Sequence, residues 1–133
     1  MIIKIVFFLF FLTHAAHAVQ NSWMDIAGGI EKSLQDAMIL YESGKTDNAM
    51  EKVADTYFGM FENEKANMEI AVRKFLSLKR AAALEKGFGD LRKGMFNKIA
   101  PADIKKQAGA LIDEVKRAAG ELDRKGVKLS SEF

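Results

Sequence analysis

The chain has 133 residues, of which 20 are Lys or Arg and 18 are Asp or Glu, and it contains no cysteine. A chain of this length forms one domain and can bury a substantial core. The formal net charge of +2 argues against a nucleic-acid-binding protein, which normally carries a basic stripe. The missing cysteines exclude disulfides and thiolate metal sites.

The N-terminal segment has the layout of a secretory signal peptide. Lys4 supplies a positive charge, Ile5–Leu12 is an unbroken apolar run, and Ala16–Ala18 is a small-x-small cleavage site. The run is shorter than the roughly 20 residues that span a bilayer, so cleavage is favoured over an uncleaved anchor. We therefore predict a signal peptide at residues 1–18, a single mature domain at residues 19–133, and a periplasmic location.

Both histidines of the chain, His14 and His17, lie inside the predicted signal peptide. A mature chain without histidine or cysteine excludes His-based catalytic triads, Cys/His zinc sites and blue-copper centres. We therefore predict that the protein is not an enzyme. Any metal would be held by oxygen ligands, which suit hard cations, with at most some help from methionine thioethers.

Apolar residues in the mature chain recur at steps of three and four, which is the spacing of one helix face. Three segments show this pattern, namely Trp23 to Tyr41, Ala81 to Met95 and Ile104 to Leu122. No segment alternates as a strand would. The lengths of the segments suit an antiparallel bundle better than a long coiled coil.

Capping residues mark the ends of the first two predicted helices. Asn21 or Ser22 can cap the first helix, and Gly44 is placed to end it. Thr46 or Asp47 can cap the second helix.

Further breaks divide the rest of the chain. The polar segment Asn63–Asn67 separates the second helix from a short helix that carries Met68–Phe75. Ser77 either caps the next helix or lies within a kinked continuous one. Pro101 suits the first turn of the last helix, and Gly126 can end it. The predicted fold is all-α, an up-and-down antiparallel bundle of four main helices with a short or kinked extra helix.

The segment from Tyr57 to Met95 mixes aromatic residues with carboxylates and arginines more than a helical bundle requires. Its large apolar residues are most simply assigned to the core: Tyr57, Phe58, Phe61, Phe75, Phe88 and Met95. Its carboxylates are less simply explained. Glu62, Glu69 and Glu85 sit beside apolar residues, where a carboxylate is costly unless it is paired or bound to a metal.

Arginines that can pair with these glutamates are close in the sequence. Arg73 lies four residues after Glu69, on the same helix face. Arg80 and Arg92 lie in the same predicted helix as Glu85. The spacing alone favours ion pairs that fix helix register. It leaves open a carboxylate site shared between helices, such as bundles build for metals, and also a purely solvent-facing role.

Five stretches of the chain carry a resemblance to a known family: L-Y-E-S-G-K-T-D-N-A (40–49), A-D-T-Y-F (54–58), F-E (61–62), M-E-I-A-V-R (68–73) and L-E-K-G-F-G-D-L-R (84–92). They resemble the periplasmic N-terminal helical domain of bacterial high-affinity iron permeases of the oxidase-dependent iron transporter family. The similarity runs from about residue 34 to about residue 122, which is most of the mature chain. It rests on spaced residues rather than on one unique signature.

The resemblance implies a helical metal-handling domain outside the membrane that binds iron, or another divalent or trivalent cation. Glu62, Glu69 and Glu85 match acidic positions of the family motif, so the resemblance implies them as candidate metal-handling residues. The implied partner is a membrane iron permease or its periplasmic components.

The chain departs from the family in one large respect, because it lacks the transmembrane helices with Arg-Glu-x-x-Glu motifs on which transport depends. It is therefore not a permease by itself. It is interpreted as a free-standing domain that serves a separate permease. A truncated relic, or a bundle retained for another use, are the alternatives.

The rival function is a protein-interaction module whose glutamates form structural ion pairs. The sequence also leaves open that two copies of the chain form a homodimer.

Overall fold

The computed structural model describes residues 21–130, which form five α-helices and one π-helical turn, with no strand among them. The elements are α1 (Trp23–Glu42), α2 (Thr46–Thr56), the π-helical turn η1 (Tyr57–Phe61), α3 (Met68–Phe75), α4 (Leu78–Phe96) and α5 (Pro101–Arg124). The prediction of an all-α fold is confirmed. The predicted signal peptide at residues 1–18 lies outside the described residues. Within residues 21–130, no helix has both the length and the apolar character needed to cross a membrane.

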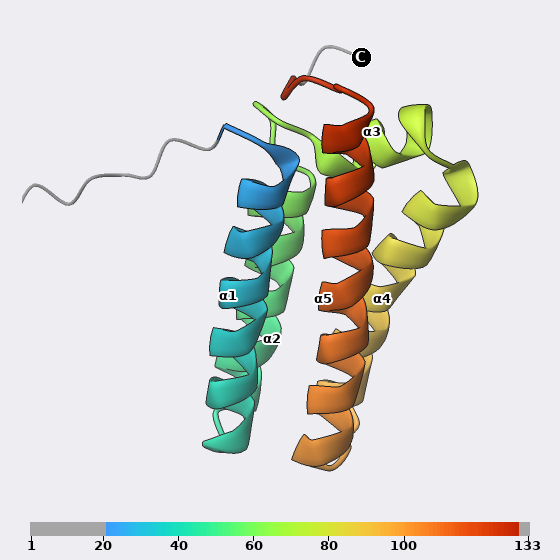
Figure 1. The fold of residues 1–133 in the computed structure, drawn as a ribbon. Helices are drawn as coiled ribbons and strands as arrows, with labels where there is room; N and C mark the ends of the chain where they lie inside the picture. The colour runs from blue at the N-terminus through green and yellow to red at the C-terminus, as the bar shows by residue number, and fades with distance from the viewer. Residues whose placement is uncertain (1–20, 131–133) are drawn as a thin grey trace, which may run out of the picture.

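The long helices lie side by side, and α3 lies near one end of them (Figure 1). The chain runs in opposite directions in α1 and α2, and again in α4 and α5. α1 packs against α2 and α5, while α4 packs against α2, α3 and α5. The end of α2, the turn η1, the helix α3 and the first part of α4 therefore meet at the same end of the molecule.

Most of the predicted helix ends are where the capping residues placed them. The Ser22 hydroxyl accepts a hydrogen bond from the Asp25 N–H (3.1 Å) at the start of α1, and Gly44 follows α1 with a φ of +77°, which favours glycine. The Ser77 hydroxyl accepts from the Arg80 N–H (3.2 Å). α3 and α4 are therefore two helices, and not one kinked helix.

The second helix begins differently from the prediction. Its N-cap residue is Lys45, which forms no side-chain capping hydrogen bond, so the assignment of the cap to Thr46 or Asp47 was wrong. The turn after α1 is tight, because the Lys45 N–H already bonds to the Leu40 carbonyl (2.9 Å). The chain therefore enters α2 one residue earlier than a side-chain cap would allow.

The apolar seams of the sequence form one continuous core. Its largest fully buried side chains include Trp23, Ile30, Leu34, Phe61, Leu91, Met95, Ile104 and Leu122. Each such side chain contributes about 1.5–3 kcal/mol when it leaves water. Phe61 and Phe88 meet within this core, with ring centroids 5.3 Å apart, so the predicted core positions of Phe61, Phe88 and Met95 are confirmed.

Two aromatic residues assigned to the core lie at the surface instead. Phe58 is 64% exposed and Phe75 is 36% exposed. A π-helical turn accommodates an extra residue, which shifts the side-chain directions that follow Thr56. Phe58 consequently faces outward, while Tyr57 is half-buried and packs against Phe88 (5.3 Å between centroids). Phe75 is exposed because it is the last residue of α3, at the corner with α4.

Asp123 joins the beginning of α1 to the end of α5. Its two carboxylate oxygens accept hydrogen bonds from the N–H groups of Trp23 (2.9 Å) and Met24 (3.0 Å). The Trp23 indole N–H donates to the Val127 carbonyl (2.7 Å) just beyond α5. The first N–H groups of a helix have no partner within the helix, so Asp123 acts as a cap supplied from the other end of the domain.

We expect Asp123→Ala to lower the free energy of unfolding by about 1–2 kcal/mol, because two N–H groups of α1 lose their acceptor. Chemical denaturation followed by circular dichroism would measure the change. Asp113→Ala is the matched control, because Asp113 is an exposed aspartate of the same helix. Equal losses in the two variants would contradict the capping role.

Candidate metal centre

Glu62 is positioned by the π-helical turn. It follows Phe61 directly, and its N–H donates to the Tyr57 carbonyl (2.8 Å), which closes the turn. The chain then leaves the helix through a polar loop, in which the Asn63 side chain accepts from the Lys65 N–H (2.8 Å). The loop returns so that Asn67 lies opposite Glu62. This return places the start of α3 beside the end of η1.

Glu69 and Glu85 come from the two helices that follow. The Asn67 side chain accepts from the Ile70 N–H (3.0 Å) and caps α3, so Glu69 lies in the first turn of that helix. Glu69 is only 5% exposed, whereas Glu85, in the second turn of α4, is partly exposed. A buried carboxylate needs compensation, and Glu69 is the one that most needs a partner.

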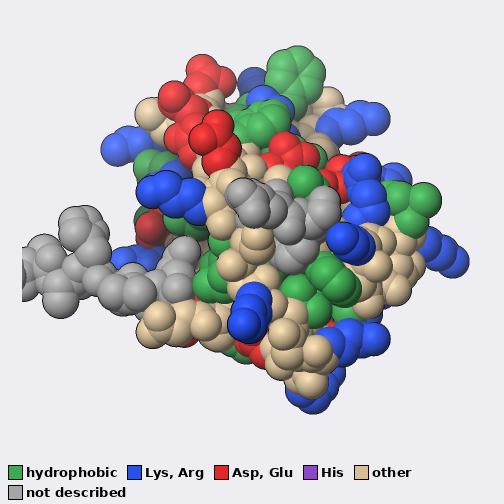
Figure 2. Space-filling model, turned by 90° about the horizontal axis from the view of Figure 1, so that it is seen from above, with side chains coloured by type: hydrophobic (Ala, Val, Ile, Leu, Met, Phe, Trp, Pro, Cys, Tyr) green, Lys and Arg blue, Asp and Glu red, His purple; other side chains and the backbone are tan. Residues whose placement is uncertain are grey.

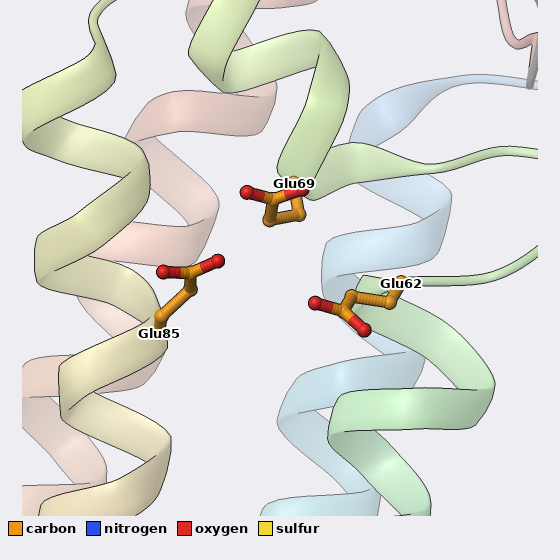
Figure 3. Close-up of side chains that lie close together, drawn as sticks. All are labelled: Glu62, Glu69 and Glu85. Atoms are coloured by element: carbon orange, nitrogen blue, oxygen red, sulfur yellow. The ribbon is translucent and has the colours of Figure 1, made fainter.

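The three glutamates converge. Glu62, Glu69 and Glu85 each offer a carboxylate oxygen, and these three oxygens lie within 4.8 Å of one another. Figure 3 shows the three side chains reaching from separate elements toward a common space. The sequence left open whether the glutamates meet, and the structure brings all three together.

Arg73 is the cation that pairs with this cluster in residues 21–130. Its Nη2 forms ion pairs with the carboxylates of Glu69 and Glu85, the latter at 3.2 Å. Arg80 pairs with Glu121 instead (2.5 Å). Of the three predicted arginine partners, Arg73 alone forms an ion pair with the cluster.

Arg92 lies beside the cluster without pairing with it. It lines a pocket of about 250 Å³ together with Tyr57, Phe58 and Glu85. This pocket gives solvent a route to Glu85. The cluster is therefore reachable from outside, although Glu69 itself is buried.

Tyr57 orients one of the carboxylates. Its hydroxyl donates a hydrogen bond to Glu62 Oε1 (2.5 Å). Burial, followed by the hydrogen bond to Glu62, raises the pKa of Tyr57 well above its ordinary value. The phenol is therefore a proton donor at neutral pH, and it holds Glu62 in the way that an outer-shell residue holds a metal ligand.

The charge of Glu69 is disfavoured in the folded protein. Burial raises the pKa of the Glu69 carboxyl above its ordinary value, and the neighbouring Glu85 and Glu62 add to this effect, while the positive charge of Arg73 opposes it. One guanidinium thus compensates the cluster incompletely. A second positive charge between the carboxylates would stabilise the ionised form of Glu69.

The donor set fits a hard cation. Three oxygens within 4.8 Å of one another leave an ion at their centre at most about 2.8 Å from each, so the oxygens need only a small approach to reach the 2.3–2.6 Å of calcium. Shorter bonds, such as those of first-row ions near 2.0–2.2 Å, require the oxygens to approach one another by about 1 Å from that separation. Carboxylates at the ends of flexible side chains permit such a shift.

Two contacts at this site were missing from the sequence interpretation. The hydrogen bond from the Tyr57 hydroxyl to Glu62 depends on the π-helical turn, which resembles ordinary helix in the sequence. The Arg73–Glu85 ion pair joins residues 12 positions apart on two helices. The absence of any acidic residue between Glu69 and Glu85 is the one signal that draws attention to that pair.

Comparisons of the chain with protein-family models, with curated proteins and with solved structures found no match. The resemblance to the helical domain of iron permeases therefore stands as a prediction from the residues. The geometry of the three glutamates is an independent observation.

Proposed function

We propose that this chain is a periplasmic helical domain that binds iron, or a similar cation, and delivers it to a membrane permease. The observation that carries the proposal is the convergence of Glu62, Glu69 and Glu85 within 4.8 Å. The family resemblance supplies iron as the cation and the permease as the partner.

The proposal includes an up-and-down antiparallel bundle of four main helices, with α3 as the short extra helix. The opposite directions of α1 and α2, and of α4 and α5, support this arrangement. Such a bundle would hold η1 and α4 firmly, while α3 and its preceding loop carry Glu69. Cation binding would then draw α3 toward the other two elements.

Arg73 suggests how a bound cation would be released. Its guanidinium is half-exposed and pairs with the carboxylates of Glu69 and Glu85. A cation entering the cluster would displace the guanidinium from the carboxylates. When the cation leaves, Arg73 would restore the charge balance, so that the empty site is not left with three opposing carboxylates.

Titration calorimetry with Fe²⁺, Mn²⁺ and Ca²⁺ tests the proposal. We expect saturable binding of one ion by the wild type and a rise in its melting temperature, since a ligand that binds the folded state stabilises it. The triple variant Glu62→Gln, Glu69→Gln, Glu85→Gln should show neither effect. A control that replaces Glu42, Glu51 and Asp55 by their amides has the same net charge and exposed sites, and it should bind as the wild type does.

The second candidate function is a protein-interaction module, which the Arg73 ion pairs with Glu69 and Glu85 favour. In that case the glutamates fix the positions of α3 and α4, and the triple variant should be less stable in the absence of metal. Added cations should leave the melting temperatures of both proteins unchanged. Equal calorimetric traces for the wild type and the triple variant would refute the cation proposal.

A further inference from the structure

The pocket that Arg92 and Glu85 line has a volume of about 250 Å³ and lies between α4 and the segment formed by α2 and η1. Pockets that hold drug-sized ligands measure about 300–1,000 Å³. A volume slightly below that range suits a single ring with its substituents. The pocket is too small to receive a folded partner.

Aromatic rings form the apolar part of this pocket. Phe88, at 2% exposure, lies at its buried end, whereas Phe58 is 64% exposed. The Tyr57 ring stands between them, with its centroid 4.9 Å from that of Phe58 and 5.3 Å from that of Phe88, edge to face with both. Aromatic rings attract a further ring in the same edge-to-face or offset arrangements, so this lining favours an aromatic ligand.

Arg92 supplies a positive charge that the fold itself does not use. Within residues 21–130, Arg92 forms no ion pair, whereas Arg73, Arg80 and Arg117 each pair with a glutamate. A guanidinium presents two parallel N–H groups that match the two oxygens of a carboxylate. Arg92 is therefore suited to hold the carboxylate of a ligand.

Glu85 lies at the other end of the pocket. It comes seven residues before Arg92 in α4, which places the two on one helix face about 10.5 Å apart along the axis. A carboxylate offers about four acceptor positions, so its ion pair with Arg73 leaves Glu85 able to accept another hydrogen bond. Figure 2, seen from the end where α3 lies, shows hydrophobic side chains at the surface between acidic and basic ones.

We propose that this pocket binds a small aromatic carboxylate whose ring carries a hydrogen-bond donor opposite the carboxylate. The carboxylate pairs with Arg92, the ring lies against Tyr57, Phe58 and Phe88, and the donor meets Glu85. The order of these groups along α4 fixes the direction of the ligand. This binding goes beyond the proposed cation function and does not require a cation.

The probe is 4-hydroxybenzoate, titrated into the full chain without added cation and followed by the backbone amide signals in nuclear magnetic resonance spectra. We expect saturable shifts centred on Gly89 and Arg92, with a Kd of about 1 mM or below, as a ligand of about ten non-hydrogen atoms reaches. Phenol should bind at least about tenfold more weakly and benzoate about threefold more weakly, because each lacks one hydrogen-bonding group.

Two substitutions test the pocket itself. Arg92→Gln should weaken binding at least about tenfold, since a hydrogen bond to a charged group contributes that much. Lys93→Gln, the same loss of charge at the next exposed residue of α4, should bind as the wild type does.

The second substitution, Gly89→Leu, fills the pocket without disturbing the fold. A Cβ at Gly89 meets no atom within 4 Å, and leucine favours a helix over glycine, so this variant should melt at a higher temperature and yet lose binding. Gly28→Leu is its control, because Gly28 is an equally open, exposed helical glycine away from the pocket. It should gain stability and keep binding.

The proposal is overturned if 4-hydroxybenzoate causes no saturable shifts, if the shifts centre elsewhere, or if phenol binds as tightly. It is also overturned if Arg92→Gln or Gly89→Leu binds as the wild type does. Because no cation is present, failure of the cation proposal would leave all of these expected results unchanged.

Discussion

Glutamine in place of Glu69 is expected to raise the stability of the metal-free protein while it weakens cation binding at least about 100-fold. Changes to residues that only orient metal ligands already cost about 10–100-fold in affinity, so loss of a ligand charge should cost no less. The gain in stability follows from burial and from the neighbouring carboxylates, which raise the pKa of Glu69. The amide keeps the shape of the side chain and removes the disfavoured charge.

The direction of this stability change can be tested by measuring stability as a function of pH. A carboxyl whose folded-state pKa is raised stabilises the fold fully below the pKa of the unfolded chain, and this contribution is lost as the pH rises through the folded-state pKa. Melting temperatures measured from acid to neutral pH should therefore fall more steeply for the wild type than for Glu69→Gln. At neutral pH the variant should melt at the higher temperature.

Glu121→Gln is the control: it makes the same chemical change, but its effect on stability should have the opposite sign. The hydrogen bond from Arg80 lowers the pKa of Glu121, so its contribution to stability is present above the unfolded pKa and is lost as the pH falls. This variant should lose stability at neutral pH and keep its cation affinity. A lower melting temperature for Glu69→Gln would show instead that the Glu69–Arg73 ion pair is structural.

Replacing Arg73 by glutamine is expected to lower the stability of the metal-free protein and to strengthen cation binding, the opposite of both effects at Glu69. The metal-free protein should be less stable, because Glu69 and Glu85 lose the cation that pairs with them. Cation affinity should rise about tenfold, since a unit charge about 6 Å from a divalent ion opposes it by ~1.4 kcal/mol in a water-like dielectric. Calorimetric titration and thermal unfolding of the same preparation measure both quantities.

Arg80→Gln provides the comparison, because Arg80 pairs with Glu121 and not with the cluster. It should lower stability without strengthening cation binding. If Arg73→Gln behaves in the same way, the guanidinium does not compete with a cation, and the proposed release by Arg73 is wrong.

The helices could be predicted because their signals are local. Steps of three and four residues identify the buried faces, and Gly44 and Ser77 mark ends that the structure confirms. Phe58 was misplaced because a π-helical turn has no distinct apolar spacing in the sequence. Its extra residue changes which side chains face inward, and that follows from packing around Tyr57 and Phe61.

The candidate site could be predicted in its residue types but not in its geometry. The unusual carboxylates beside apolar residues identified Glu62, Glu69 and Glu85, yet Glu62 follows η1, Glu69 lies in α3 and Glu85 lies in α4. Their distances depend on how α3 lies between η1 and α4, which no local pattern determines. The bridging role of Arg73 depends on the same packing.

The hydrogen bonds between Asp123 and the start of α1 have a consequence for folding of the newly synthesised chain. Asp123 lies 100 residues after Trp23, so a chain synthesised from its N-terminus makes the first helix, with its local Ser22 cap, long before it makes this second acceptor. Domains tend to fold as units, and contacts this remote in sequence slow their closure. The N–H groups of Trp23 and Met24 therefore gain their carboxylate acceptor only after α5 has been synthesised and has packed against α1.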